Sequence, residues 1–262
     1  MEGVQLAIAN TFDKGLKLLE LFTREKSRLT LRDVSERSGL TKPTALRLLN
    51  TLESNGFLMR DKSKAYCLGL RFLEFGNAVA ERLDIRSAAL PHMDELLLTV
   101  DQAVNLVIRD GLEGVYIEKR ETSHPVRMYT RIGRRAPLYA GACPRALIAF
   151  LPDAELQELL PKFALAAQTT STPRSIEDLE EKIKRERKLG YCFSQGELFD
   201  GTAAIAMPVR DHSRKVVGAV SVSGSNVSFG AEKLEYLVRH LSRCAEAISA
   251  EMGYKNIKGI RP

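Results

Sequence analysis

The sequence has few of the features that mark secreted, membrane-spanning or metal-binding proteins. Four cysteines among 262 residues are scattered without the paired spacing of a disulfide framework or a zinc site, which favours a reducing compartment. No apolar run approaches the roughly 18 residues that a membrane-spanning helix needs. Residues 1–9 lack the basic start and apolar core of a signal peptide. We therefore expect a soluble, cytoplasmic protein with no membrane partner.

The motifs of common catalytic sites are missing as well. The sequence contains neither a phosphate-binding P-loop nor a Gly-rich dinucleotide turn. The serine-rich stretch 221–224 does not fit the G-x-S-x-G pattern of a nucleophile elbow. The four histidines lack the i,i+4 spacing and the neighbouring Cys or carboxylate residues of a zinc site. We expect no catalytic residue, no metal and no cofactor.

The positive charge is concentrated near the N-terminus. The net charge is +6, and the window 24–71 holds eleven basic residues against five acidic ones, so the rest of the chain is balanced. A local excess of this kind marks the place where a polyanion docks.

The same window predicts a helix-turn-helix. Residues 11–23 form an amphipathic helix, and a short helix over 31–38 begins after the N-cap Thr30 and ends at Gly39. Thr41 caps a third helix that extends to about Asn55. A short helix, a Gly-containing turn and a second capped helix are typical of this motif.

The third helix has two different faces. Its inner face is apolar, whereas its outer face carries hydroxyl, amide and guanidinium groups and no aliphatic residue larger than proline. Such groups hydrogen-bond phosphates and base edges in a major groove, although an ordinary solvated face is the alternative. The outer residues are Pro43, Thr44, Arg47, Asn50, Thr51 and Ser54.

A basic hairpin follows this helix. Residues 57–60 and 65–68 read as two short strands around a polar turn. We interpret the hairpin as a wing whose Arg60, Lys62 and Lys64 contact sugar and phosphate.

The rest of the chain predicts an α+β fold. We expect a DNA-binding domain over 1–69, a linker helix over 70–84, an effector-binding domain over 85–254 and a tail over 255–262. Strands before, between and after helices favour an antiparallel sheet flanked by helices. The predicted strands are 103–109, 115–120, 126–132, 202–209 and 216–223, and the predicted helices are 85–99, 143–150, 153–160, 175–188 and 231–252.

Two short segments suit a small ligand. In a strand, Ser221 and Ser223 project to the same face, where two hydroxyls can bind a polar ligand or simply meet water. Ala142 and Cys143 enter a helix at Pro144, and N–H groups at a helix N-terminus favour an anion.

The charged run 177–188 has acids first and bases last, which predicts a solvated surface helix.

These motifs together resemble the isocitrate lyase regulator (IclR) family of transcription factors over nearly the whole chain. The resembling segments are Leu31 to Leu49, Gly56 to Leu58, Tyr66 to Gly69, Pro137 to Ala140, Arg145 to Ala149, Gly190-Tyr191, Glu197, Gly201, Ala204 to Val209 and Ala219 to Gly224.

The resemblance implies a winged helix-turn-helix domain, a linker helix and a C-terminal effector-binding domain similar to GAF domains. It implies a dimer, or a dimer of dimers, whose binding to an operator in double-stranded DNA responds to a small organic acid. By likeness, DNA contacts fall on Thr41, Thr44 and Arg47, and we add Arg32, Lys42 and Asn50 as neighbouring polar positions. Effector contacts fall on Ala142, Cys143, Ser194, Ala204, Ser221 and Ser223.

The chain departs from the family pattern at several positions. Pro144 and Arg145 replace a usual Gly-Lys pair, and Pro43 replaces a common serine. Ser194 and Ala204 stand where some members have an aspartate and a cysteine, so the pocket loses an acid and a thiol. We therefore expect a carboxylate effector with an apolar or aromatic body instead of a very small polar acid. Separately, we expect a repressor rather than an activator. The alternative is a metabolite-binding protein or enzyme whose basic module binds another polyanion, such as RNA.

Overall fold

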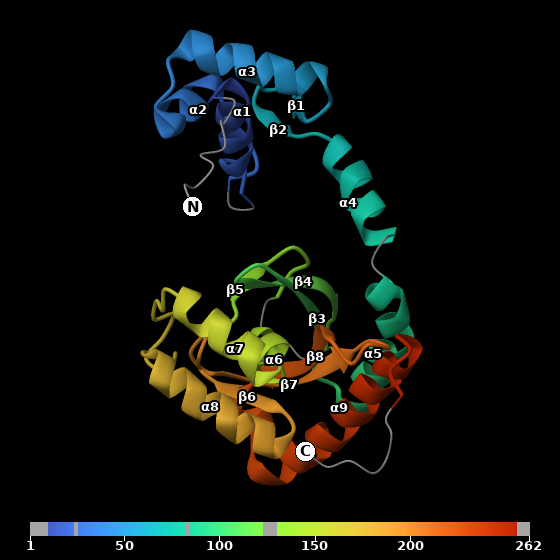
Figure 1. Cartoon of the computed structure of the whole chain (residues 1–262). Helices are drawn as coiled ribbons and strands as arrows, with labels where there is room; N and C mark the ends of the chain where they lie inside the picture. The colour runs from blue at the N-terminus through green and yellow to red at the C-terminus, as the bar shows by residue number, and fades with distance from the viewer. Residues whose placement is uncertain (1–9, 24–25, 82–83, 123–129, 256–262) are drawn as a thin grey trace. The chain divides into compact units, whose positions relative to one another are not determined.

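The structure is a computed structural model, and it describes residues 10–23, 26–81, 84–122 and 130–255. The chain divides into two compact units, Met1–Arg82 and Leu83–Pro262 (Figure 1). Each unit has its own apolar core.

The first unit is a three-helix module with a hairpin and a further helix. Its core includes Leu18, Val34, Leu49 and Tyr66, from α1, α2, α3 and β2 respectively. Burial of these side chains supplies the main stabilisation of so small a unit. The elements are α1 (Asn10–Glu20), α2 (Leu31–Ser38), α3 (Lys42–Ser54), β1 (Leu58–Arg60), β2 (Tyr66–Leu68) and α4 (Arg71–Glu81).

The ends of α2 form as the sequence predicts, and the start of α3 forms differently. Thr30 and Asp33 make a complete capping box, and Gly39 ends α2 in the left-handed region with φ 68°. Thr41 occupies the N-cap position of α3, but its hydroxyl donates 3.0 Å to the Thr44 hydroxyl instead of capping the backbone. Pro43 lies in that first turn and has no N–H to offer.

The second unit is built on one antiparallel sheet in the order β5-β4-β3-β8-β7-β6. Its strands are β3 (Ala103–Asp110), β4 (Glu113–Arg120), β5 (Arg135–Pro137), β6 (Cys192–Gln195), β7 (Thr202–Arg210) and β8 (Val216–Ser225). Its helices are α5 (Asp84–Val100), α6 (Ala142–Ala149), α7 (Asp153–Leu159), α8 (Ile176–Leu189) and α9 (Ala231–Glu251), with short 3₁₀ turns η1 (Leu160–Lys162) and η2 (Asn226–Phe229).

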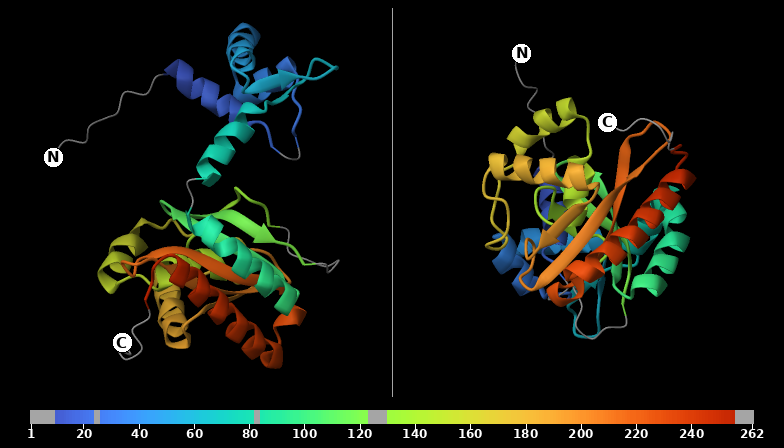
Figure 2. Two further views of the ribbon diagram at one scale, coloured as in Figure 1. Left: turned by 90° about the vertical axis from the view of Figure 1, so that its right-hand side faces the viewer. Right: turned by 90° about the horizontal axis from the view of Figure 1, so that it is seen from below.

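Helices cover both faces of this sheet. Figure 2 shows α5 and α9 side by side. Apolar side chains of these two helices form one core with the sheet, and those of α6, α7 and α8 form the other. The predicted α+β class with an antiparallel sheet flanked by helices is therefore confirmed.

The differences from the prediction lie in short edge strands. Residues 126–129 of the strand predicted over 126–132 lie outside the described residues, and 130–132 are not a strand. The strand that pairs with β4 is β5, only three residues long and ending in Pro137, so it has almost no periodic pattern. The edge strand β6 was not predicted either, because its four residues are too few to show a periodic pattern.

Candidate functional site

The outer face of α3 presents polar groups to solvent. Thr41, Lys42, Arg47 and Asn50 are exposed, and Thr44 is half-buried. On α2, Arg32 is also exposed, in an i,i+4 ion pair of 2.7 Å with Glu36. Exposed ion pairs are weak, so Arg32 is free to exchange partners.

One apolar side chain interrupts this polar face. Leu46 is 37% exposed, although it is not one of the residues predicted for the outer face. Its neighbours Ala45 and Leu49 fill the inner side of the helix, so Leu46 is left at the border between the two faces. A leucine at such a border can contact a thymine methyl group.

The hairpin β1–β2 has the form of a wing. Asp61 closes its turn, because one carboxylate oxygen accepts from the Ser63 N–H at 2.8 Å and from the Ala65 N–H at 3.2 Å. Lys64 adopts φ 65° in this turn, and both Lys62 and Lys64 are exposed. The two lysines are therefore presented at the tip, as predicted.

Arg60 has a different set of partners from those lysines. Its guanidinium lies 2.8 Å from the Glu53 carboxylate and donates at 2.8 Å to the Asn50 side-chain oxygen. It also stacks 4.7 Å from the centre of the Tyr66 ring. Arg60 and Asn50 are thus paired with one another, and Arg60 joins the wing to α3.

All six predicted effector residues line one buried cavity in the second unit. Ala142 and Cys143 come from the N-terminus of α6, and the other four come from three neighbouring strands. The register places Ser194 beside Ala204 and Ala204 beside Ser223, and Ser221 lies two residues along β8 on the same face. The cavity is lined by Asn105, Tyr116, Gly141, Ala142, Cys143, Ser194, Leu198, Thr202, Ala203, Ala204, Ser221 and Ser223.

Asn105 is the most informative lining residue that the sequence reasoning missed. It is 1% exposed, and its side-chain nitrogen donates at 3.0 Å to the Ser223 hydroxyl and at 3.5 Å to the Ser221 hydroxyl. Its side-chain oxygen is buried without a hydrogen-bond partner. A buried unpaired carbonyl is costly, so this oxygen is a ready acceptor for a ligand. The available signal was a single amide in the otherwise apolar run 103–108.

The titratable groups of the cavity are held neutral. Burial raises the pKa of the Cys143 thiol to about 12, and burial raises the pKa of Tyr116 well above its ordinary value. The thiol therefore stays protonated at neutral pH and is no nucleophile. The cavity offers hydroxyls, an amide and helix N–H groups to a ligand.

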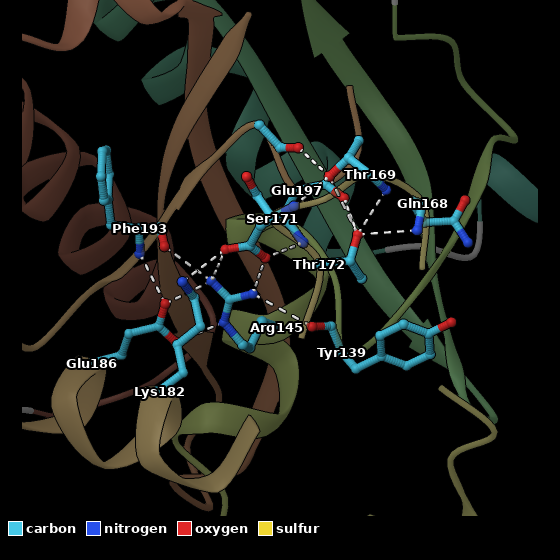
Figure 3. Close-up of polar contacts among 12 residues, drawn as sticks. Tyr139, Arg145, Gln168, Thr169, Ser171, Thr172, Lys182, Glu186, Phe193 and Glu197 are labelled. Carbon is cyan, nitrogen blue, oxygen red and sulfur yellow. Dashed lines mark hydrogen bonds and ion pairs between the residues drawn. The ribbon is translucent and has the colours of Figure 1, made fainter. Parts of the chain in front are cut away.

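A buried cluster of charges lies behind the N-terminus of α6. Arg145 is fully buried and binds Glu186 through two hydrogen bonds of 2.7 and 2.8 Å (Figure 3). It also binds Glu197 at 2.5 and 3.2 Å. Glu197 in turn accepts from the Gly141 N–H at 2.9 Å, and Lys182 lies 2.8 Å from the same carboxylate.

This cluster corrects the prediction for the charged run 177–188. The run forms α8, but Glu186 is only 3% exposed and belongs to the interior instead of the solvated face. Its partner Arg145 lies 41 residues away along the chain, so no local pattern marked the pair.

Other kinds of site find no support in the described part of the chain. Its His, Cys, Asp and Glu residues include no group of three placed to hold a metal ion. Over residues 10–23, 26–81, 84–122 and 130–255, no helix combines the length and apolar character needed to cross a membrane.

Comparison with known proteins agrees with the two-unit description. The model of the IclR helix-turn-helix domain matches residues 11–62, and that of the bacterial transcriptional regulator IclR C-terminal domain matches residues 77–250. The chain is 43% identical to the HTH-type transcriptional regulator KipR of Bacillus subtilis over 244 residues, which cover 93% of this chain and 97% of KipR.

Solved structures have the same fold. The IclR protein of Thermotoga maritima has a TM-score of 0.81 and 31% identity, covering 94% of this chain and 100% of that one. An IclR homologue of Microbacterium hydrocarbonoxydans in complex with 4-hydroxybenzoate has a TM-score of 0.80 and 24% identity, covering 93% of this chain and 99% of the other. This chain belongs to the IclR family of bacterial transcriptional regulators, in which a helix-turn-helix domain binds DNA and a C-terminal domain binds an effector.

Proposed function

We propose that this protein is a repressor that binds its operator as a homodimer, or as a dimer of dimers, and responds to a carboxylate effector with an apolar or aromatic body. The observation that carries the effector class is the cavity that Ser194, Ala204, Ser221 and Ser223 share with the N-terminus of α6. Hydroxyls and helix N–H groups suit a carboxylate, and Ala204 adds an apolar side chain to the lining, which suits a body without polar groups.

The chemistry of the cavity supports an acid over a neutral sugar or a base. The N–H groups of Ala142 and Cys143 are the first of α6 and have no acceptor within the helix. The side-chain oxygen of Asn105 adds one acceptor, which suits a hydroxyl on the effector. The M. hydrocarbonoxydans homologue holds 4-hydroxybenzoate, so a protein of this fold accepts an aromatic hydroxy acid.

The DNA contacts follow from the exposed face of α3 and from the wing. We assign base contacts to Thr41, Thr44 and Arg47, because they lie at the N-terminal end of α3, which enters the major groove in helix-turn-helix proteins. Backbone phosphates are assigned to Arg32, Lys42, Lys62 and Lys64. Asn50 and Arg60 are proposed to contact DNA only after exchanging their mutual hydrogen bond, while Arg60 keeps its ion pair with Glu53.

Dimerisation is supported by exposed apolar side chains on the first unit. Phe12 is 70% exposed on α1, and Leu73 is 61% exposed on α4. Such residues are typical of a protein interface, and an operator with two half-sites about one helical turn apart needs two copies of α3. We propose residues 1–69 as the DNA-binding domain, 70–84 as the linker, 85–254 as the effector domain and 255–262 as the tail, without catalytic activity.

Two measurements test this proposal. Selection of bound duplexes from a random DNA pool should enrich a palindrome with half-sites about one turn apart. Calorimetry should then show binding of aromatic acids in preference to a small keto acid such as glyoxylate. Tight binding of glyoxylate with none of benzoate or 4-hydroxybenzoate would contradict the effector class. Equal affinity for single-stranded RNA and duplex DNA would contradict the operator function.

A further inference from the structure

The buried charge cluster behind the cavity links the α6 N-terminus to α8. Arg145 and Lys182 supply two positive charges, and Glu186 and Glu197 supply two negative charges, so the cluster is neutral as a whole. Arg145, Glu186 and Glu197 have side chains at most 4% exposed, whereas Lys182 is 34% exposed. Lys182 is therefore the member whose charge can be removed without leaving a fully buried arginine unpaired.

Glu197 is connected to the cavity lining through its own carboxylate and through the next residue, Leu198. Its carboxylate accepts the Gly141 N–H at 2.9 Å, immediately before the N–H groups of Ala142 and Cys143. Its chain neighbour Leu198 lines the cavity and approaches Gly141 so closely that a Cβ at Gly141 would lie 2.6 Å from a Leu198 methyl group. The φ of 80° at Gly141 likewise suits glycine alone.

The backbone of Glu197 is fixed independently of its carboxylate. The Thr172 hydroxyl donates to the Glu197 carbonyl oxygen at 2.7 Å, and Thr169 donates to the Gly196 carbonyl at 2.5 Å (Figure 3). Burial by itself would raise the pKa of Glu197, but Arg145 and Lys182 lower that pKa below its ordinary value. The carboxylate is thus ionised and rigidly placed at neutral pH.

An ionised carboxylate beside a proposed anion site is unfavourable unless it is neutralised. Glu197 lies next to the N–H groups that we assign to the effector carboxylate, and like charges at this range repel. Arg145 divides its charge between Glu186 and Glu197, which leaves Lys182 to complete the balance.

We infer that Glu197 is a positioning residue that fixes the start of α6 for effector binding, and that Lys182 neutralises it so that the site accepts an anion. This inference rests on the proposed function for the identity of the ligand as a carboxylate. The positioning role of Glu197 can be tested without a ligand, because the hydrogen bond between Glu197 and Gly141 exists in the free protein.

The charge role is tested with Lys182→Gln and the matched control Lys184→Gln, an exposed lysine two residues along α8. Binding of benzoate and of its neutral counterpart benzamide is measured by calorimetry on the full chain. Lys182→Gln should weaken benzoate binding roughly five- to tenfold and change benzamide binding less than twofold, because only the acid meets the uncompensated charge. Lys184→Gln should change neither. Equal weakening of both ligands, or of neither, would overturn the charge role.

The positioning role is tested without ligand by amide hydrogen exchange. Glu197→Gln should raise exchange of the segment 139–145 about tenfold or more, while β3 and α9 keep the wild-type rates. A folded Glu197→Gln protein with unchanged exchange at 139–145 would overturn it. If this variant does not fold, Lys182→Gln with benzoate and benzamide still tests the charge role, and hydrogen exchange of Lys182→Gln at 139–145 tests the positioning role, with wild-type exchange expected because Glu197 keeps its hydrogen bond to Gly141. A wild type that binds no aromatic acid contradicts the proposed function, whereas the exchange result stands by itself.

Discussion

The first unit carries an ion pair exposed to water, whereas the second unit also buries a cluster of ion pairs in its interior. On the first unit, Arg32 and Glu36 form an ion pair with side chains 77% and 60% exposed. In the second unit, Arg145 and its two glutamates are almost completely removed from water. An exposed pair contributes little to stability and exchanges partners easily, whereas a buried charge becomes a large cost once its partner is lost.

Exposed and buried ion pairs suit different roles. Exposed cations can recognise a ligand, whereas buried ones hold the fold together. The cations of the first unit are available to a polyanion because their present partners bind weakly. The buried Arg145 of the second unit serves the fold and the cavity, and no external ligand can reach it. Net charge therefore indicates where DNA binds, but it says nothing of where charge matters most for stability.

The largest effect is expected from Arg145→Met. This change leaves Glu186 buried without a cation and Glu197 with Lys182 alone, so we expect a loss of about 3–5 kcal/mol in the free energy of unfolding. Chemical denaturation of the full chain, followed by circular dichroism, measures it. Arg185→Met is the control, since Arg185 forms an exposed pair with Glu181 and should cost at most about 1 kcal/mol. Equal losses of stability in the two variants would show that the buried ion pairs matter no more for folding than the exposed one.

A smaller effect, on binding instead of folding, is expected from Arg47→Ala. Arg47 is exposed on α3, and a base contact from it predicts a loss of about 1–3 kcal/mol in operator binding with relaxed sequence preference. Competition binding against a set of single-base operator variants measures both. Arg239→Ala, which removes an exposed arginine of α9, should bind as wild type. Unchanged operator binding by Arg47→Ala would show that α3 is not the recognition helix.

Lowering the pH should gradually remove the contribution of Glu197 to the free energy of unfolding. The folded pKa of Glu197 lies below its ordinary value of 4.5, so its ionised form stabilises the protein at higher pH. This contribution is complete above the unfolded pKa and is lost as the pH falls through the folded pKa. The stability difference between wild type and Glu197→Gln should therefore shrink between about pH 6 and about pH 3, as measured by denaturation at each pH. A difference that stays constant would mean that Glu197 does not titrate in this range.

Local features of the fold could be predicted, because they depend on neighbouring residues. The capping box of Thr30 and Asp33 and the shared face of Ser221 and Ser223 need only a short stretch of chain. The polar face of α3 likewise follows from helical periodicity, with the exposed Leu46 at its border.

The charge cluster could not be predicted in the same way. Arg145 meets Glu186 and Glu197 across 41 and 52 residues of chain, and α8 alone reads as a solvated helix. Arg60 poses the same difficulty at shorter range, since its charge suggests a phosphate contact while Glu53 and Asn50 bind it. Residue type and exposure can be read from a sequence pattern, but the partner of a charged side chain depends on the tertiary fold.

The smallest effect is expected in the wing, where Lys62 and Arg60 can be compared directly. Lys62 is exposed at the tip, so Lys62→Ala should weaken binding evenly across DNA sequences and reduce the slope of log K against log salt by about one unit. Arg60 is already neutralised by Glu53, so Arg60→Ala should lower affinity while leaving that slope nearly unchanged. Titrating both variants with one duplex at several salt concentrations separates the two roles. A slope reduced equally in both would mean that DNA displaces Glu53 and that Arg60 contacts phosphate in the complex, as the charge of the hairpin by itself predicts.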